Sequence, residues 1–177
     1  QTRSSRIPVR AGWIFDGWKT NDVVVDKNGR FTMPGKDVTF TATWERDENN
    51  NGIPDSQEKR YDIYYETGSR DKVTNMPSDE YNVLPGLEKA VSRLEPKRAG
   101  YVFTGWETDD VRVDAYGRFI MPRYDVTFTA SWAVDRNGDG KPDASEYYTL
   151  IYESNGGTEY ANERYEGGTY VALKKTP

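Results

Sequence analysis

The sequence contains neither cysteine nor histidine in its 177 residues. This absence excludes zinc sites built on cysteine or histidine, haem ligation by histidine, and the Ser–His–Asp and Cys–His arrangements of nucleophilic enzymes. Cysteine avoidance is common in bacterial surface proteins that do not rely on disulfides, and it also fits a cytosolic protein. The missing residues therefore remove several catalytic classes but do not locate the protein.

The sequence also lacks an excess of basic residues and lacks long apolar runs. The net charge is −5, whereas a protein that binds nucleic acid needs a basic footprint for the phosphates. No apolar run approaches the roughly 18 residues of a membrane span, and the first residues do not resemble a signal peptide. We therefore expect no nucleic-acid partner and no membrane span in this segment, while the acidic balance is compatible with cation binding.

Aromatic residues are abundant in an otherwise polar chain. Phe, Trp and Tyr make up 14% of the residues, 30% are charged, and the mean hydropathy is −0.91. Small modules have small cores, so aromatic side chains must supply much of their buried area. For the four tryptophans that recur in pairs, core packing is favoured over stacking against sugars; these are Trp18, Trp44, Trp106 and Trp132.

The chain repeats itself at a spacing of 88 residues. Gly17-Trp18 recurs as Gly105-Trp106, and the hexapeptide at 37–42 recurs unchanged at 125–130. Self-similarity at a fixed period indicates an array of modules. Arrays usually present or space something, whereas catalysis usually needs one unique site. We therefore expect no catalytic residues and no enzyme activity.

Alternation of apolar and polar residues predicts β-strands. In the segment 37–44, Val38, Phe40, Ala42 and Trp44 fall on one face and threonines on the other, the pattern of a half-buried strand. Segment 126–132 repeats it. Further strands are expected at 13–15, 23–25, 30–33, 61–65, 101–103, 111–113, 118–121 and 148–153. A short helix is expected at 87–94, where apolar residues recur at helical spacing.

These elements predict one complete module at 59–132, between the C-terminal part of a module at 1–44 and the N-terminal part of another at 147–177. The linkers are 45–58 and 133–146. One interpretation is a piece of a longer array. The other is head-to-tail assembly, in which 147–177 of one copy completes 1–44 of the next by strand addition and builds a filament.

Both linkers match the pattern D-x-[DN]-x-[DN]-G-x₅-E. Calcium is a hard cation that takes six to eight oxygen ligands, and one 12-residue loop can supply them from positions 1, 3, 5, 7, 9 and 12. Position 7 contributes its backbone carbonyl. The candidate metal ligands in the first loop are Asp47, Asn49, Asn51, Ile53, Asp55 and Glu58. Those in the second loop are Asp135, Asn137, Asp139, Lys141, Asp143 and Glu146.

The alternative is a metal-free linker, because Asn, Asp and Gly favour turns in any case. A full match that occurs twice favours calcium. Pro54 and Pro142, together with flanking strands, distinguish the loops from helix–loop–helix sensors. The loops resemble the calcium loops of bacterial thrombospondin type 3 repeats and, more loosely, those of dockerins. The second loop offers four carboxylates and the first three, so we expect the second to bind calcium more tightly.

Segments 98–106, 119–122 and 125–132 together resemble the Listeria–Bacteroides repeat, the family that includes the B repeats of internalin B. Segment 148–157 matches the usual start of that repeat. The resemblance implies tandem small β-rich, β-grasp-like modules on secreted or wall-anchored bacterial proteins, where such repeats mostly form stalk and adhesion segments. It brings no catalytic residues.

The sequence therefore predicts a mainly β, extracellular structural repeat of a bacterial cell-surface stalk, adhesin or filament, with joints stiffened by Ca²⁺. Its expected partners are neighbouring modules or copies of the same protein. The alternative is an adhesive module that binds host protein or glycan through exposed aromatic residues. Calcium-dependent rigidity would favour the first hypothesis and saturable ligand binding the second.

Overall fold

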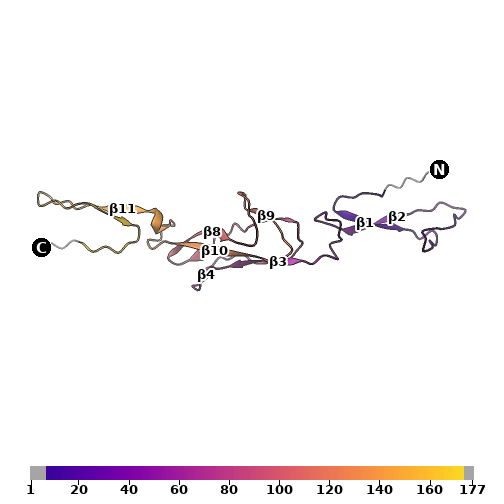
Figure 1. The fold of residues 1–177 in the computed structure, drawn as a ribbon, viewed down its shortest axis with the longest axis horizontal. Helices are drawn as coiled ribbons and strands as arrows, with labels where there is room; N and C mark the ends of the chain where they lie inside the picture. Colours follow the sequence, from indigo (N-terminus) through magenta and orange to yellow (C-terminus); the bar gives the residue numbers. More distant parts are fainter. Residues whose placement is uncertain (1–6, 174–177) are drawn as a thin grey trace.

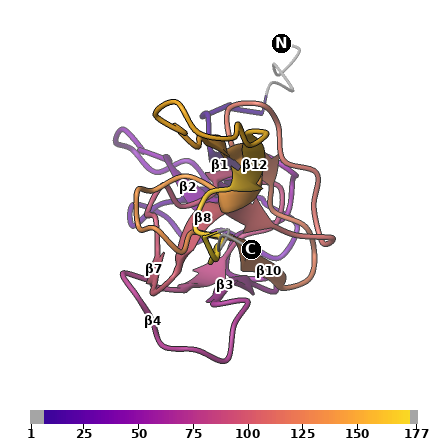
Figure 2. The same cartoon turned by 90° about the vertical axis from the view of Figure 1, so that its left-hand side faces the viewer.

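A computed structural model describes residues 7–173, which form three β units strung along one long axis (Figure 1). We call residues 7–46 the N-terminal unit, 61–134 the central module and 147–173 the C-terminal unit. The N-terminal and C-terminal units lie at opposite ends, with the central module between them. Viewed down the long axis, the three units overlap in projection (Figure 2).

The N-terminal unit is an antiparallel pair of strands, β1 (Trp13–Lys19) and β2 (Thr41–Arg46). Trp13 lies opposite Arg46, and the register shifts between Phe15 and Gly17. In the central module, β8 (Tyr101–Glu107) and β10 (Val126–Val134) pair in the same way. The two hairpins therefore share both register and bulge.

The central module adds strands around its hairpin to make a six-stranded sheet in the order β4-β7-β8-β10-β3-β5. Strand β10 lies inside this sheet, antiparallel to β8 and parallel to β3. A second, two-stranded sheet joins β6 to β9. The remaining strands are β3 (Tyr61–Glu66), β4 (Val73–Thr74), β5 (Glu80–Val83), β6 (Glu88–Ala90), β7 (Lys97–Arg98) and β9 (Arg118–Ile120).

The C-terminal unit is a single antiparallel pair, β11 (Tyr147–Leu150) and β12 (Glu163–Glu166). One 3₁₀ turn, η1 (Asp143–Ser145), precedes it within the second linker. Among residues 7–173 this turn is the one helical element. The expectation of a mainly β fold is confirmed, whereas the described chain contains no α-helix of the kind that packs on a β-grasp sheet.

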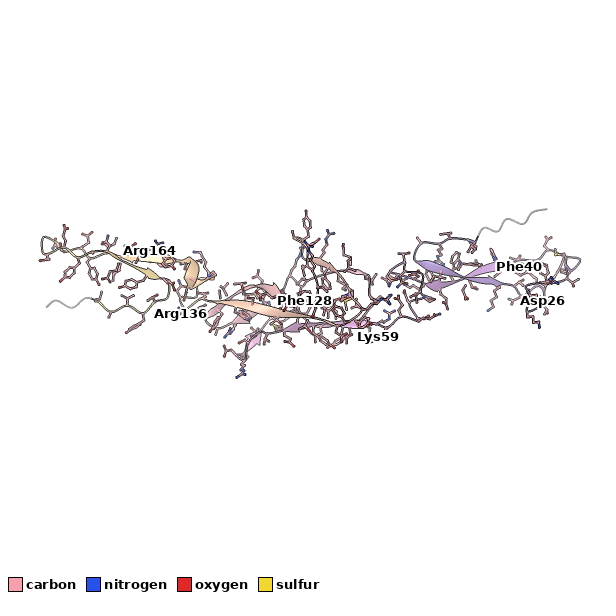
Figure 3. The ribbon with its side chains drawn as sticks, in the orientation of Figure 1. Asp26, Phe40, Lys59, Phe128, Arg136 and Arg164 are labelled. Carbon is pink, nitrogen blue, oxygen red and sulfur yellow. The ribbon has the colours of Figure 1, made fainter. Side chains whose placement is uncertain are left out.

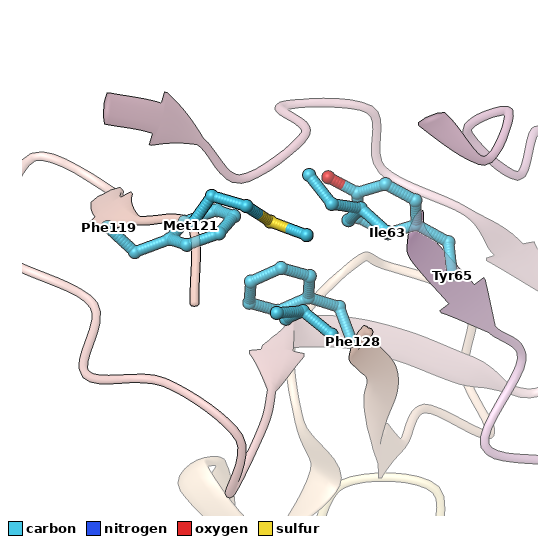
Figure 4. Close-up of a cluster of buried hydrophobic side chains, with 6 residues drawn as sticks. Ile63, Tyr65, Phe119, Met121 and Phe128 are labelled. Carbon is cyan, nitrogen blue, oxygen red and sulfur yellow. The ribbon is translucent and has the colours of Figure 1, made fainter. Parts of the chain in front are cut away.

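The core lies in the central module, where β3, β9 and β10 meet (Figure 4). Alternate residues of β10 point inward, so Val126 and Phe128 are fully buried. The Tyr65 ring stacks on Phe128 with centroids 5.6 Å apart, and Trp106 packs edge-on against Tyr65 at 5.0 Å. Aromatic residues thus supply much of the core of this small module.

Several sequence predictions fail here. No helix forms at 87–94, because β6 pairs with β9 and places Lys89 opposite Phe119. Segments 23–25 and 111–113 are not strands; Val111 and Val113 instead pack their side chains against the core. Trp18 is 57% exposed rather than buried. The N-terminal unit holds no equivalent of Tyr65, the ring that covers the matching Trp106.

Other predicted strands are only partly formed. Those expected at 13–15, 61–65, 101–103 and 126–132 are confirmed. The strand expected at 37–44 begins only at Thr41, and the one expected at 148–153 ends at Leu150. Segment 30–33 forms no strand, although the matching 118–120 does. The same sequence pattern thus has different outcomes in different units.

The matched pair Phe128 and Phe40 tests where the core lies. Phe128→Ala removes a fully buried ring and should destabilise the central module by about 3–5 kcal/mol. Phe40→Ala removes the half-buried counterpart and should leave the central module unchanged. Hydrogen exchange of peptides from 61–134, measured by mass spectrometry, reads this difference. Equal protection in the two variants would contradict a core confined to the central module.

Candidate metal-binding joints

Each linker folds around the side chain of its first aspartate. Asp47 accepts the backbone N–H of Asn51 on Oδ1 and that of Gly52 on Oδ2, both at 3.0 Å. Asp135 accepts the matching N–H groups of Asp139 at 3.2 Å and Gly140 at 3.0 Å. Aspartate side chains favour such local turns. The two loops therefore have the same local fold, built from the motif positions that the sequence singled out.

Both loops turn sharply at their glycine. Gly52 has φ of +83° and Gly140 has φ of +85°, which lies in the left-handed region where residues with a Cβ are strained. The side chains of Asn51 and Asp139 then accept the N–H two residues later, at 2.7 Å from Ile53 and 3.0 Å from Lys141. Backbone N–H groups thus hold the acidic and amide oxygens in place.

Four aspartates of the linkers are buried. They are Asp47, Asp55, Asp135 and Asp143. Within residues 7–173 no other polar or charged residue is buried. Removing a carboxylate from water carries an effective penalty of several kcal/mol unless partners or a metal compensate. The joints therefore concentrate negative charge where the rest of the described surface keeps its charges solvated.

The ninth-position aspartates anchor the loop backbone. Asp55 accepts the N–H of Glu48 at 2.9 Å and lies 3.6 Å from the Arg46 guanidinium. Asp143 accepts the N–H of Arg136 at 3.1 Å and pairs with its guanidinium at 2.8 Å. These arginines were not among the predicted site residues. The sequence could have indicated them, because each arginine is adjacent to the first aspartate of its motif.

The last position differs between the loops. In the first, Glu58 accepts the side-chain amides of Asn51 at 2.7 Å and Asn49 at 2.9 Å. Positions 3, 5 and 12 are therefore already together. A hard cation would face the oxygens of these amides rather than their nitrogens, so binding requires the two asparagines to turn.

In the second loop, Glu146 pairs through Oε1 with the Lys141 ammonium at 2.8 Å. The Glu146 carboxylate is the main reason that the pKa of Lys141 is raised. Its Oε2 is buried and has no hydrogen-bond partner at normal distance, although the carboxylate is close enough to raise the pKa of Tyr148. A buried, unsatisfied carboxylate oxygen is costly, and an oxygen-seeking cation would satisfy it.

Asp139 and Asn137 complete the second loop. Asn137 donates its amide to Asp139 at 3.1 Å. The backbone N–H of Lys141 is the main reason that the pKa of Asp139 lies below its ordinary value. The side chain therefore stays ionised over a wider pH range and remains available as an anionic ligand.

Carboxylates alone do not make a chelating cluster here. Within the part of the chain that the structure describes, no group of three or more His, Cys, Asp or Glu side chains converges on a metal-sized site. Any ion would also depend on amide and backbone carbonyl oxygens, including the carbonyls of Ile53 and Lys141. This mixed oxygen set suits calcium, whose coordination is flexible, better than magnesium or zinc.

The linkers are bonded to the units on both sides. On the preceding side, the N–H groups of Asp47 and Asp135 donate to the carbonyls of Gly12 and Gly100, both at 2.9 Å. On the following side, the Asn49 amide donates to the Pro85 carbonyl at 2.7 Å. Lys59 and Arg136 mark the two junctions in Figure 3. Sequence reasoning missed these docking residues, although Ala-Gly recurs before both hairpins.

The second linker also contacts its following unit, but through different groups. The N–H of Gly167 donates to the Glu146 carbonyl at 2.9 Å. A Cβ built on Gly168 would lie 2.7 Å from Cβ of Arg136 and 2.9 Å from Oδ2 of Asp143. The backbone of the C-terminal unit therefore lies directly against two side chains of the loop.

The hairpins and their docking turns coincide with a known repeat. Residues 9–48 and 96–136 match the divergent InlB B-repeat domain. These two segments, which make up less than half of the chain, are thus similar to the InlB B-repeat family. The resemblance to Listeria–Bacteroides repeats is confirmed for these segments. They begin before the Ala-Gly turn and end at the first residues of each linker. Members of this family are typically structural or surface proteins.

A similar protein found by sequence comparison covers most of this chain. A protein of Evansella cellulosilytica described as a Gly-rich membrane protein is 22% identical over 96% of this chain. The chain spans only 17% of the length of that relative. No solved structure is significantly similar. The B-repeat match and this relative together favour a cell-surface repeat protein. In residues 7–173, no helix has the length and apolarity to cross a membrane.

Docking of the second linker on the C-terminal unit can be tested at Gly168. Gly168→Ala should push Arg136 and Asp143 away and expose the linker, so trypsin should cleave after Arg136 several-fold faster. Gly156→Ala is the matched control, because it too has positive φ but no atom within 4 Å of the added Cβ. Equal cleavage rates in the two variants would show that the linker is not held by this contact.

Proposed function

We propose that this chain is an extracellular structural segment of a bacterial cell-surface stalk, adhesin or filament, in which calcium fixes the joints between B-repeat modules. The observation that carries the proposal is that each linker buries aspartates while being hydrogen-bonded to a unit on either side. A cation there would neutralise the buried charge and stiffen the connection at once. Rigidity of the linker then sets the direction of the next module.

In the first joint the ion would be held by Asp47, Asn49, Asn51, Asp55 and Glu58, with the carbonyl of Ile53. The buried carboxylates and the clustering of positions 3, 5 and 12 support this set. Without the ion, Glu58 relies on the asparagine amides, which are neutral donors and stabilise a carboxylate less than a charged partner would. Calcium would therefore replace weak partners with a strong one.

In the second joint the ligands would be Asp135, Asn137, Asp139, Asp143 and Glu146, with the carbonyl of Lys141. Four carboxylates favour tight binding, and the unsatisfied Oε2 of Glu146 supports a missing cation. The Lys141 ammonium opposes it, because it already occupies Oε1 of Glu146. The affinity of this joint therefore depends on how readily Lys141 withdraws.

No catalytic step enters this proposal. The grooves on the described surface are open, and the repeat family is typically structural. The second candidate function is adhesion to host protein or glycan. It is favoured by the exposed Trp18 beside Phe31 and Phe40, a surface on which a sugar ring could stack.

The joints can be tested by small-angle X-ray scattering with and without a chelator. Calcium at about 2 mM exceeds the dissociation constants typical of extracellular sites. It should narrow the range of overall lengths that the molecule adopts in solution. It should also slow tryptic cleavage after Arg136. Asp135→Ala should abolish this protection at the second joint and leave the first joint responsive. Asp114→Ala, in a turn of the central module, is the control acidic substitution and should keep both responses.

Magnesium at the same concentration serves as the ion control, because it demands near-octahedral geometry and retains its waters. Scattering curves and cleavage rates that are identical with calcium and with chelator would overturn the proposal. An equal response to magnesium would show charge screening rather than a calcium site.

The role of Lys141 gives a separate prediction. Lys141→Ile places at loop position 7 the residue that the first loop has there, and it preserves the backbone carbonyl ligand. Removal of the competing ammonium should raise the calcium affinity of the second loop at least several-fold. Isothermal titration calorimetry in an Asp47→Ala background, which silences the first loop, measures this change. An unchanged or weaker affinity would exclude competition by Lys141.

A further inference from the structure

The dipeptide Asn-Gly occurs four times in the sequence, at 28–29, 51–52, 137–138 and 155–156. Asparagine is a chemically labile residue, and a glycine after it leaves the next peptide nitrogen unhindered, because glycine has no Cβ. Two of the four dipeptides lie in the metal-binding joints. Asn51 occupies position 5 of the first loop, and Asn137 occupies position 3 of the second. Both side chains are exposed, so water reaches them.

The side chain of Asn51 is folded over the peptide bond that follows it. Its Oδ1 accepts the N–H of Ile53 at 2.7 Å, and its amide donates to Oε1 of Glu58 at 2.7 Å. The first of these bonds closes a ring of atoms that contains both Cγ of Asn51 and the nitrogen of Gly52. The side chain is therefore restricted to a conformation in which the two atoms lie in one small loop, which lowers the entropic barrier to a reaction between them.

The nitrogen of Gly52 donates its proton to a carboxylate. It lies 3.0 Å from Oδ2 of Asp47, a residue that is only 5% exposed. A general base must lie within hydrogen-bond reach of the proton that it removes, and Asp47 meets this condition. The Ile53 N–H contacts the amide oxygen on which negative charge develops during attack at Cγ, which is the role of an oxyanion-stabilising donor. Nucleophile, base and electrophile are thus present in one loop.

The second joint repeats these contacts. Gly138 donates its N–H to Oδ1 of Asp135 at 2.7 Å, and Oδ1 of Asn137 accepts the N–H of Asp139 at 3.2 Å. The Asn137 amide also donates to a carboxylate, that of Asp139, at 3.1 Å. The dipeptide stands at different motif positions in the two loops, yet in each the first aspartate of the motif accepts the glycine N–H.

The turn at 26–30 in the N-terminal unit provides a comparison within the same chain. There the N–H of Gly29 donates to the backbone carbonyl of Asp26 at 2.9 Å, and a neutral carbonyl is a much weaker base than a carboxylate. Within the described residues, Oδ1 of Asn28 accepts no hydrogen bond. Asn28 is exposed, as Asn51 is. Solvent access therefore does not distinguish the two sites, whereas their hydrogen bonds do.

We propose that Asn51 and Asn137 are modification sites at which each joint converts an amide into a carboxylate without an enzyme. The Gly52 nitrogen attacks Cγ of Asn51 and gives its proton to Asp47. The new N–C bond closes a succinimide ring, and the side-chain NH₂ group takes up a proton and leaves as ammonia. Water then adds to one ring carbonyl and breaks its bond to nitrogen. Opening at the side-chain carbonyl leaves aspartate, and opening at the backbone carbonyl leaves isoaspartate. Gly138 and Asp135 play the same parts for Asn137.

The consequence for the joint rests on the proposed function. Aspartate at position 51 gives the first loop the residue type that the second loop has at Asp139, and the added charge favours a tighter ion site. Isoaspartate adds a methylene to the backbone and displaces the turn at Gly52. A bound calcium ion would engage Oδ1 of Asn51 and the Asp47 carboxylate, so neither could take part in the reaction. A joint without its ion is therefore the one that is modified.

Conversion is measured on the 177-residue chain incubated in chelator at neutral pH. Arginine-specific digestion separates the three asparagines into peptides 11–30, 47–60 and 137–164, and fragmentation in a mass spectrometer locates each product and distinguishes aspartate from isoaspartate. Conversion at Asn51 and Asn137 should be several-fold faster than at Asn28. In concentrated urea, which abolishes the loop contacts, the three rates should converge. Rates at the joints that do not exceed the rate at Asn28 in the folded chain would overturn the proposal.

Two variants test the carboxylates separately. Asp47→Asn keeps the size of the side chain but removes the base, so conversion in chelator should slow several-fold at Asn51 and stay unchanged at Asn137. Asp135→Asn should have the reverse effect. Each variant retains one intact joint as an internal reference, so a general loss of folding is recognised by a change at both sites. Conversion at Asn51 that is as fast in Asp47→Asn as in the parent chain would contradict the proposed chemistry.

Calcium separates this proposal from the proposed function. At about 2 mM, above the dissociation constants typical of extracellular sites, it should protect Asn51 and Asn137 and leave the rate at Asn28 unchanged. If conversion in chelator is fast at the joints but calcium does not slow it, the calcium joints are wrong and the modification sites stand. If conversion in chelator is no faster at the joints than at Asn28, the modification sites are wrong whether or not calcium binds.

Discussion

The structure depends on covering one apolar face of a short β-hairpin. The B-repeat hairpin carries large side chains on one side, and two strands alone cannot bury them. In the central module the parallel neighbour β3 and the strap formed by 84–91 complete the burial, and the sheet extends to six strands. In the N-terminal unit the equivalent hairpin has the same register, but β2 begins only at Thr41, so residues 38–40 are not in a strand. Pairing with a covering strand thus decides how much of the repeat becomes ordered structure.

The linkers show a second consequence of small modules. A module with little core has little surface to spare for a broad contact with its neighbour, so the connection must be made by few groups. Each loop achieves this through its own backbone turns and through hydrogen bonds to a glycine turn on one side and a following strap on the other. Buried aspartates make this connection dependent on charge compensation. Under the proposed function, calcium bound by these 12 residues would also fix the direction of the next unit.

Predictions from the sequence were correct where the folded chain covers the apolar face that the local pattern indicates. The strand at 126–132 followed from alternation alone because β10 is covered on its apolar face. The helix expected at 87–94 was wrong because residues 88–90 pair with β9 as a strand, and Val91 packs against the core from this extended segment rather than from a helical face. The strand expected at 111–113 was wrong because its valines contact the core without a neighbouring strand. The candidate calcium ligands followed from motif spacing, and whether they bind an ion stays a prediction.

The modular character, the mainly β class, the hairpin positions and the two acidic loops could be predicted from the amino-acid sequence, because each is encoded in side chains a few residues apart. Which copy of a repeated segment is buried could not be predicted in this way and became clear from the folded chain. Phe40 and Phe128, both labelled in Figure 3, occupy the same position in the two copies of the hexapeptide, yet only Phe128 is fully buried. The physical reason is that burial depends on side chains brought from elsewhere: Tyr65 and Ile63 cover Phe128, and within residues 7–173 no equivalent strand lies beside Phe40.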